Sequence, residues 1–121
     1  MDLSLIKKYI PDFEIINFSM FSNVIEIRWV VEWDFDMPEK QENLYMTMQS
    51  EDGYEIDLKF EKVPGAEAFL NRQISGFEIK DMGKYGYDPS VRYEIRDYED
   101  GRISFNCRDV VIKDVRFWKK V

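Results

Sequence analysis

The chain has 121 residues, a formal net charge of −7 and a hydrophobic content of 45%. This length suits one domain with one packed core. The acidity argues against nucleic-acid binding, which needs a basic face, and against docking on an anionic membrane. It is compatible with a soluble protein, or with a protein partner that presents a basic surface.

The chain has no histidine and one cysteine, Cys107. This composition excludes nucleophilic Ser/His and Cys/His pairs. It also excludes zinc sites built from histidines or from several thiolates, and an intramolecular disulfide. Cys107 shares an alternating phase with Ile103 and Phe105, which predicts a buried, inert thiol. Residues 1–11 lack the long apolar run of a signal peptide or membrane span, so we expect a cytoplasmic protein.

The first third of the chain predicts a short helix and then a long hairpin. Residues 2–10 suit a helix that Asp2 caps and Pro11 ends. Residues 16–20 alternate apolar and polar, and residues 24–35 do so over a longer stretch, with apolar side chains at the odd positions. A two-residue turn at Ser22-Asn23 would join these two strands.

A second hairpin is predicted around Glu51-Asp52-Gly53, a three-residue loop with glycine in the left-handed position. This turn sets the pairing between the flanking strands. The expected core-facing pairs are Met48 with Ile56, Met46 with Leu58 and Leu44 with Phe60.

The same tripeptide recurs at Glu99-Asp100-Gly101. As a three-residue loop it pairs Ile95 with Phe105 and Tyr93 with Cys107, which keeps one face apolar. A two-residue turn would mix apolar and polar faces, so the longer loop is preferred.

Two further stretches complete the predicted fold. Residues 76–82 suit a strand with Phe77 and Ile79 inward, and residues 64–73 suit a short helix or crossover. Near the C-terminus the apolar phase slips at Lys113-Asp114, which predicts a bulge or tight turn. The sum is a mainly β domain: an antiparallel sandwich or small open barrel of about eight strands with a short N-terminal helix.

No glycine-rich phosphate loop and no calcium-loop spacing occurs in the sequence, so no cofactor or metal is expected. Two pairs of carboxylates each lie on one face of a predicted strand: Glu32 with Asp34, and Glu55 with Asp57. Because alternation explains both pairs as a solvated face, the prediction is a protein that is not an enzyme.

Two loops are candidate partner-binding surfaces. The loop at residues 83–90 carries tyrosines, which offer contact area and a hydrogen-bonding tip. The loop at residues 36–43 lies at an acidic end of the predicted sheet, where a basic partner would dock. The candidate binding residues are Tyr85, Tyr87, Asp88, Asp34, Asp36, Glu39 and Glu42.

The C-terminal half carries a pattern of the form Ile-Ser-Gly-Phe-Glu-Ile at residues 74–79, then an aromatic loop. Arg-Tyr-Glu-Ile-Arg-Asp-Tyr-Glu-Asp-Gly-Arg-Ile-Ser-Phe-Asn-Cys-Arg follows at residues 92–108. This pattern resembles small β-rich bacterial families that include immunity proteins of polymorphic toxin systems. The resemblance implies a non-enzymatic protein that binds and blocks a toxin, and an acidic charge that matches basic nuclease targets.

Three functional hypotheses remain open at this point. The first is a protein-interaction module of the immunity type, either monomeric or a dimer through a sheet edge that proline does not protect. The second is a small-molecule binder whose cavity Trp29 and Trp33 would line. The third is a carboxylate-dependent hydrolase.

Overall fold

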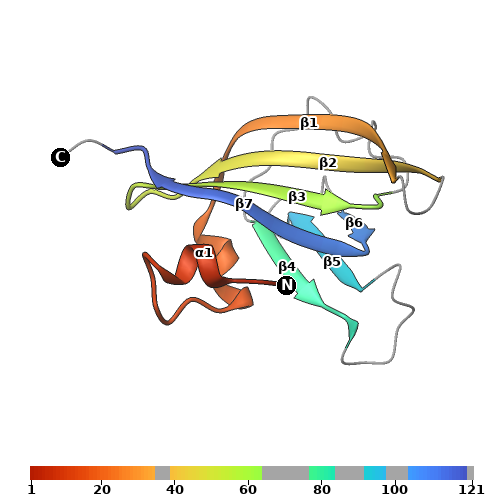
Figure 1. Ribbon diagram of the computed structural model, residues 1–121. Helices are drawn as coiled ribbons and strands as arrows, with labels where there is room; N and C mark the ends of the chain where they lie inside the picture. Colours follow the sequence, from red (N-terminus) through yellow and green to blue (C-terminus); the bar gives the residue numbers. More distant parts are fainter. Residues whose placement is uncertain (35–38, 64–76, 84–91, 98–103, 120–121) are drawn as a thin grey trace.

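The computed structural model describes residues 1–34, 39–63, 77–83, 92–97 and 104–119. These residues form two open antiparallel sheets and a short helical segment (Figure 1), which confirms the predicted mainly β fold. The four-stranded sheet has the order β1-β2-β3-β7: β1 Asn23–Asp34, β2 Glu39–Gln49, β3 Tyr54–Glu61 and β7 Asp109–Phe117. The three-stranded sheet has the order β4-β5-β6: β4 Phe77–Asp81, β5 Tyr93–Asp97 and β6 Ser104–Cys107.

The hairpin between β2 and β3 has the predicted register. Met48 pairs with Ile56, Met46 with Leu58, and Leu44 with Phe60, and all six side chains are buried. Gly53 has φ +108°, a conformation that costs glycine little and other residues more. The loop closes with a bond from the Ser50 amide to the Tyr54 carbonyl at 2.9 Å.

The second predicted hairpin pairing is also confirmed. Ile95 pairs with Phe105, and Tyr93 with Cys107, between β5 and β6. The turn at residues 98–103 that joins these strands lies outside the described residues, as does the predicted crossover at residues 64–73.

The predicted phase slip in the last strand is a bulge. β3 and β7 pair Asp57 with Asp114 and Leu58 with Ile112, so Lys113 is the extra residue. In a regular strand Ile112 and Val115, three positions apart, would face opposite sides of the sheet. The extra residue lets both of them face the core.

The predicted strand over residues 16–20 is wrong, and so is the hairpin at Ser22-Asn23. Ile15–Met20 form the 3-10 helix η1, whose first turn is closed by a capping box between Glu14 and Asn17. Phe18 is buried whereas Ile16 is 77% exposed, so period-two alternation does not describe this segment. The described residues contain seven strands.

The N-terminal helix is shorter than predicted. α1 spans Ser4–Lys7, and the Asp2 carboxylate accepts a bond from the Ser4 amide at 2.9 Å. Beyond Lys7 the amides of Tyr9 and Ile10 both donate to the Ile6 carbonyl, which carries the chain to Pro11. A helix of this length has few internal bonds, so the burial of Ile6 fixes it in place.

Strand β1 departs from the predicted face in one respect. A bulge between Val24 and Glu26 makes Ile25 the extra residue, and its side chain is 55% exposed instead of facing the core. Val24 packs against the core in its place. Trp33, near the far end of the strand, is 61% exposed.

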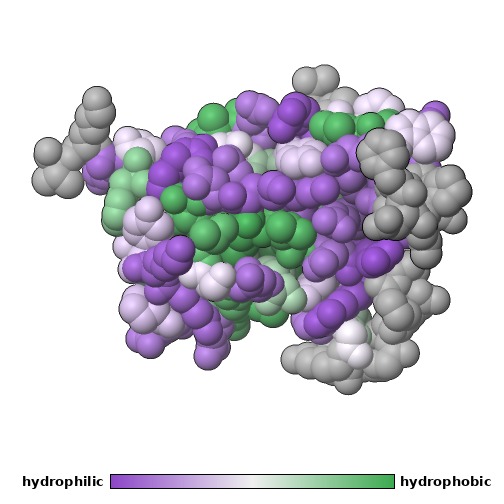
Figure 2. All heavy atoms as spheres, viewed as in Figure 1, coloured by the Kyte–Doolittle hydropathy of each residue, from purple (hydrophilic) through white to green (hydrophobic). Residues whose placement is uncertain are grey.

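The core lies between the two sheets and the N-terminal segment. Phe60 of β3 meets Phe105 of β6 edge to face, with ring centroids 5.4 Å apart, which ties the layers together. Phe13, Phe18 and Phe21 close one end of this core and are fully buried. Figure 2 shows apolar side chains in a band beneath β7, framed by polar residues.

We expect Gly53→Val to lower the free energy of unfolding by about 1–3 kcal/mol, because a β-branched residue resists φ +108°. A Cβ there would also lie 3.0 Å from the Cβ of Lys119. Urea denaturation measures the change, with Asp52→Ala, at an exposed position of the same turn, as the control. Equal stability of the two variants would show that Gly53 has no special role in the turn.

Candidate interaction surfaces

The structure describes only part of the predicted binding set. Tyr85, Tyr87, Asp88 and Asp36 lie outside the described residues. Asp34 and Glu39 pair in register at the end of the β1–β2 ladder. The sequence-predicted surface therefore stays a prediction for most of its members.

Glu42 lies further along β2, opposite Val31. It is half-buried, and its carbonyl accepts a bond from the Val63 amide at 2.8 Å. Glu42 is separated from the buried residues Leu44 and Met46 by even numbers of positions along β2. Because side chains alternate between the two faces of a strand, Glu42 lies on the core side of the sheet.

The outer face of the four-stranded sheet holds a first polar cluster around Glu32. Its carboxylate accepts bonds from the Tyr45 hydroxyl at 2.6 Å and the Asn43 amide at 2.8 Å, and Lys59 lies 3.5 Å away. The Tyr45 bond is the main cause of a lowered Glu32 pKa, which burial partly opposes. Burial and the bond to Glu32 raise the Tyr45 pKa, so neither group is poised to exchange a proton near neutral pH.

A second polar cluster surrounds Arg116. Its guanidinium donates to Asp57 at 2.8 Å and Asp114 at 2.8 Å and forms an ion pair with Glu55. Thr47 donates a further bond to Asp57 at 2.6 Å. Glu55 and Asp57, one of the carboxylate pairs considered for hydrolysis, therefore converge on a cation, an arrangement that stabilises the sheet.

Four aromatic residues form a partly exposed aromatic surface: Tyr9, Tyr54, Phe117 and Trp118. The ring of Phe117 lies 4.7 Å from Tyr54 and 5.3 Å from Tyr9, centroid to centroid. Phe117 is 58% exposed, and Tyr9 and Trp118 are exposed as well. Local sequence patterns do not predict this surface, because its members come from three distant segments.

Two hydrogen bonds hold Trp118 of the aromatic surface at the β2–β3 turn. The Trp118 indole donates to the Ser50 carbonyl at 3.1 Å, and the Trp118 amide donates to the Gly53 carbonyl at 2.9 Å. The C-terminal strand thus lies against the same turn that sets the β2–β3 register. A side chain already held in place, as Trp118 is, loses less entropy when it binds.

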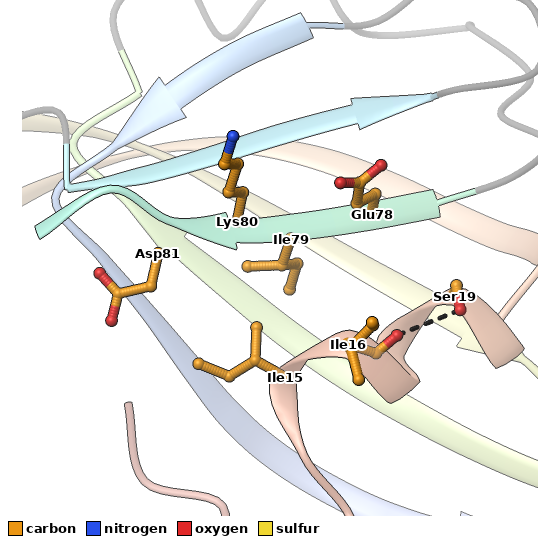
Figure 3. A pocket seen from close by; sticks show the side chains of 7 residues that line it. All are labelled: Ile15, Ile16, Ser19, Glu78, Ile79, Lys80 and Asp81. Atoms are coloured by element: carbon orange, nitrogen blue, oxygen red, sulfur yellow. Dashed lines mark hydrogen bonds between the residues drawn. The ribbon is translucent and has the colours of Figure 1, made fainter. Parts of the chain in front are cut away.

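An open cleft of about 560 Å³ lies between η1 and β4 (Figure 3). Ile79 points from β4 toward Ile15 of η1, while Glu78 and Lys80 point the other way. Its volume falls in the range of small-molecule sites. However, the cleft is open and contains no unpartnered buried polar group among its described lining residues.

The cavity that the sequence predicts at Trp29 and Trp33 does not coincide with the cleft between η1 and β4. Trp33 is 61% exposed, and Trp29 is half-buried with an indole N–H that finds no acceptor among the described residues. Neither tryptophan lines the cleft between η1 and β4. The two side chains belong to the half-covered face of β1.

No protein-family model, curated protein or solved structure matches this chain. Within the described ranges, no group of three or more Asp, Glu or Cys side chains is arranged to hold a metal ion. In that same part of the chain, no helix has the length and apolar character needed to cross a membrane.

We expect Asp57→Asn to weaken the dependence of stability on acid pH. Burial opposes ionisation of Asp57, but bonds from Arg116 and Thr47 outweigh it and hold the folded pKa below 3.8. The resulting stabilisation is complete above the ordinary pKa and is lost as pH falls through the folded pKa.

At pH 7 the variant should therefore be less stable by about 1 kcal/mol, and the difference should shrink as the pH falls below about 4. Denaturant midpoints from pH 2 to 7 measure this, with Asp52→Asn, an exposed turn residue, as control. Parallel pH profiles for wild type and Asp57→Asn would contradict the assignment.

Cys107 should be unreactive in the folded protein. It is fully buried, and burial, with Asp109 and Glu61 nearby, raises the pKa of its thiol. Because the thiolate is the reactive form, iodoacetamide should label the native protein far more slowly than the protein in 8 M urea. Similar rates by mass spectrometry would show that the thiol is accessible.

Proposed function

We propose that this protein is a non-catalytic protein-interaction module whose partner presents a basic surface, and that it acts as an immunity protein. The observation that carries the proposal is the aromatic surface. Tyrosine and tryptophan are the residues most enriched at binding hot spots. Here Tyr9 and Trp118 are exposed, Tyr9 packs against Phe117, and hydrogen bonds anchor Trp118 to a turn.

Charge supports a basic partner. The chain carries a net charge of −7, so its field favours encounter with a positively charged protein. The faces of exposed Tyr9, Phe117 and Trp118 also attract arginine and lysine side chains by cation–π interaction. Aromatic contact and long-range attraction therefore select the same class of partner.

The immunity role rests on the resemblance of residues 74–108 to β-rich immunity families. A protein of that kind works by occupying the working surface of a toxin, which requires a stable interface and no chemistry of its own. The engaged carboxylates of Glu55 and Asp57 suit that role, since both serve the Arg116 cluster.

The test compares wild type with the double variant Tyr9→Ala/Phe117→Ala. Each bait is used for affinity capture from the source cells, and the captured protein is then purified and titrated. Truncation of two hot-spot rings should weaken binding by about 2 kcal/mol or more, roughly 30-fold. Binding should also weaken as salt rises.

Ile16→Ala is the matched control, because Ile16 is an exposed apolar residue on η1 that does not belong to the aromatic surface. Expression of the captured protein should arrest growth, wild type should restore it, and the double variant should restore it poorly. Absence of a stoichiometric partner, or full protection by the double variant, would refute the proposal.

A further inference from the structure

Strand β1 is an open edge of the four-stranded sheet. It pairs with β2 along its whole length, and no other described element packs along it. Figure 1 shows β1 at the outer rim of the sheet. An edge strand of twelve residues without proline offers a row of backbone donors and acceptors for further pairing.

The ladder identifies which backbone groups point outward. The bond from the Ser50 amide to the Tyr54 carbonyl makes these residues a hydrogen-bonded pair. In an antiparallel ladder, hydrogen-bonded residue pairs alternate with pairs that are not hydrogen-bonded. The backbone groups of even-numbered β2 residues therefore bond to β3, and those of odd-numbered β2 residues bond to β1. Tyr45 therefore bonds to Arg28, its partner in register.

It follows that even-numbered residues of β1, from Glu26 onward, direct their amides and carbonyls toward β2. The odd-numbered residues direct theirs to the open edge. These outward residues are Ile27, Trp29, Val31 and Trp33.

The face beside this edge is apolar and incompletely covered. No described side chain of β1 is fully buried, and Trp33 is 61% exposed. The indole N–H of Trp29 lacks an acceptor in the described part of the chain. The same strand thus combines exposed aromatic surface with backbone groups that pair with no described strand.

We propose that a second copy of this chain pairs with β1, antiparallel, about a two-fold axis at Val31. Val31 would exchange both backbone bonds with its symmetry mate, because its amide and carbonyl point outward. Trp29 then stands opposite Trp33 of the second copy, which forms two cross-strand aromatic pairs. Arg28 stands opposite Asp34 of the second copy, so the pairing is complementary in charge.

The neighbouring registers fit less well. An axis at Trp29 would place Glu26 opposite Glu32 of the second copy, and like charges in register destabilise a sheet. An axis at Ile27 would bring the bulged Ile25 into the ladder. An axis at Val30 would place Glu26 opposite Asp34 of the second copy, and an axis at Glu32 would place Glu32 opposite its own symmetry mate. Among these registers, the axis at Val31 is the one that keeps the ladder within the regular part of β1, pairs Arg28 with Asp34 and sets no like charges of β1 opposite one another.

The other sheet edges are less suited to pairing. β7 carries a bulge at Lys113, and α1 packs against it. β4 has η1 packed closely alongside. β6 has only four residues.

Sedimentation velocity over a concentration series tests the proposal. Wild type should shift from monomer toward dimer as concentration rises. Val31→Pro and Trp33→Glu should each reduce the dimer fraction at least tenfold at a fixed concentration. The proline removes an outward amide and no bond to β2, and Trp33 is largely exposed, so both variants should stay folded. Ile16→Glu, an exposed apolar residue on η1, should dimerise like wild type.

A charge exchange tests the register. Arg28→Asp and Asp34→Arg each place like charges opposite one another and should be monomeric alone. Mixed in equal amounts, they should form a heterodimer with wild-type-like affinity, because each cross-strand pair then has opposite signs. Circular dichroism verifies folding of every variant.

A wild type that stays monomeric up to millimolar concentration would overturn the proposal. A dimer insensitive to both Val31→Pro and Trp33→Glu would place the interface elsewhere, and failure of the mixed variants to associate would exclude the Val31 axis. These outcomes are separate from the partner test, since that test changes Tyr9 and Phe117 on the other side of the sheet.

Discussion

The register between β2 and β3 is the constraint on which the rest of the structure depends. Gly53 adopts φ +108° and allows a three-residue loop, which sets Ser50 opposite Tyr54. A slip of one residue would turn Met46 and Leu58 from the core to the solvent. The same register decides which backbone groups of β2 bond to β1, and hence which groups of β1 remain at the open edge.

Much of this architecture could be predicted because turn chemistry and side-chain alternation agree. The repeated Glu-Asp-Gly sequence gave both hairpin registers, and the change of phase near Lys113 located the β7 bulge. The segment before β1 could not be predicted this way. Three alternating apolar residues suit a strand, but the Glu14–Asn17 capping box and the burial of Phe18 favour a 3-10 helix.

The aromatic surface could not be found from local patterns, because its residues are far apart in the chain. Tyr9 follows α1, Tyr54 follows a turn and Phe117 ends the last strand. Each has an ordinary explanation alone, as a helix-end, strand-start or strand-end residue. Only the pairing of β3 with β7, which places Tyr54 opposite Phe117, brings the rings together. The predicted tyrosine loop, by contrast, rested on composition and lies outside the described residues.

The two proposed surfaces lie at opposite sides of one sheet, whose order is β1-β2-β3-β7. Pairing through β1 would join two copies into an eight-stranded sheet with β7 at both outer edges. The aromatic surfaces, built on β3 and β7, would then face outward at the two ends and remain accessible. Such a dimer presents two equivalent binding surfaces, so a partner with repeated or symmetric sites would gain avidity without any new contact. The acidic charge also doubles, which strengthens the attraction between this assembly and a basic partner before contact.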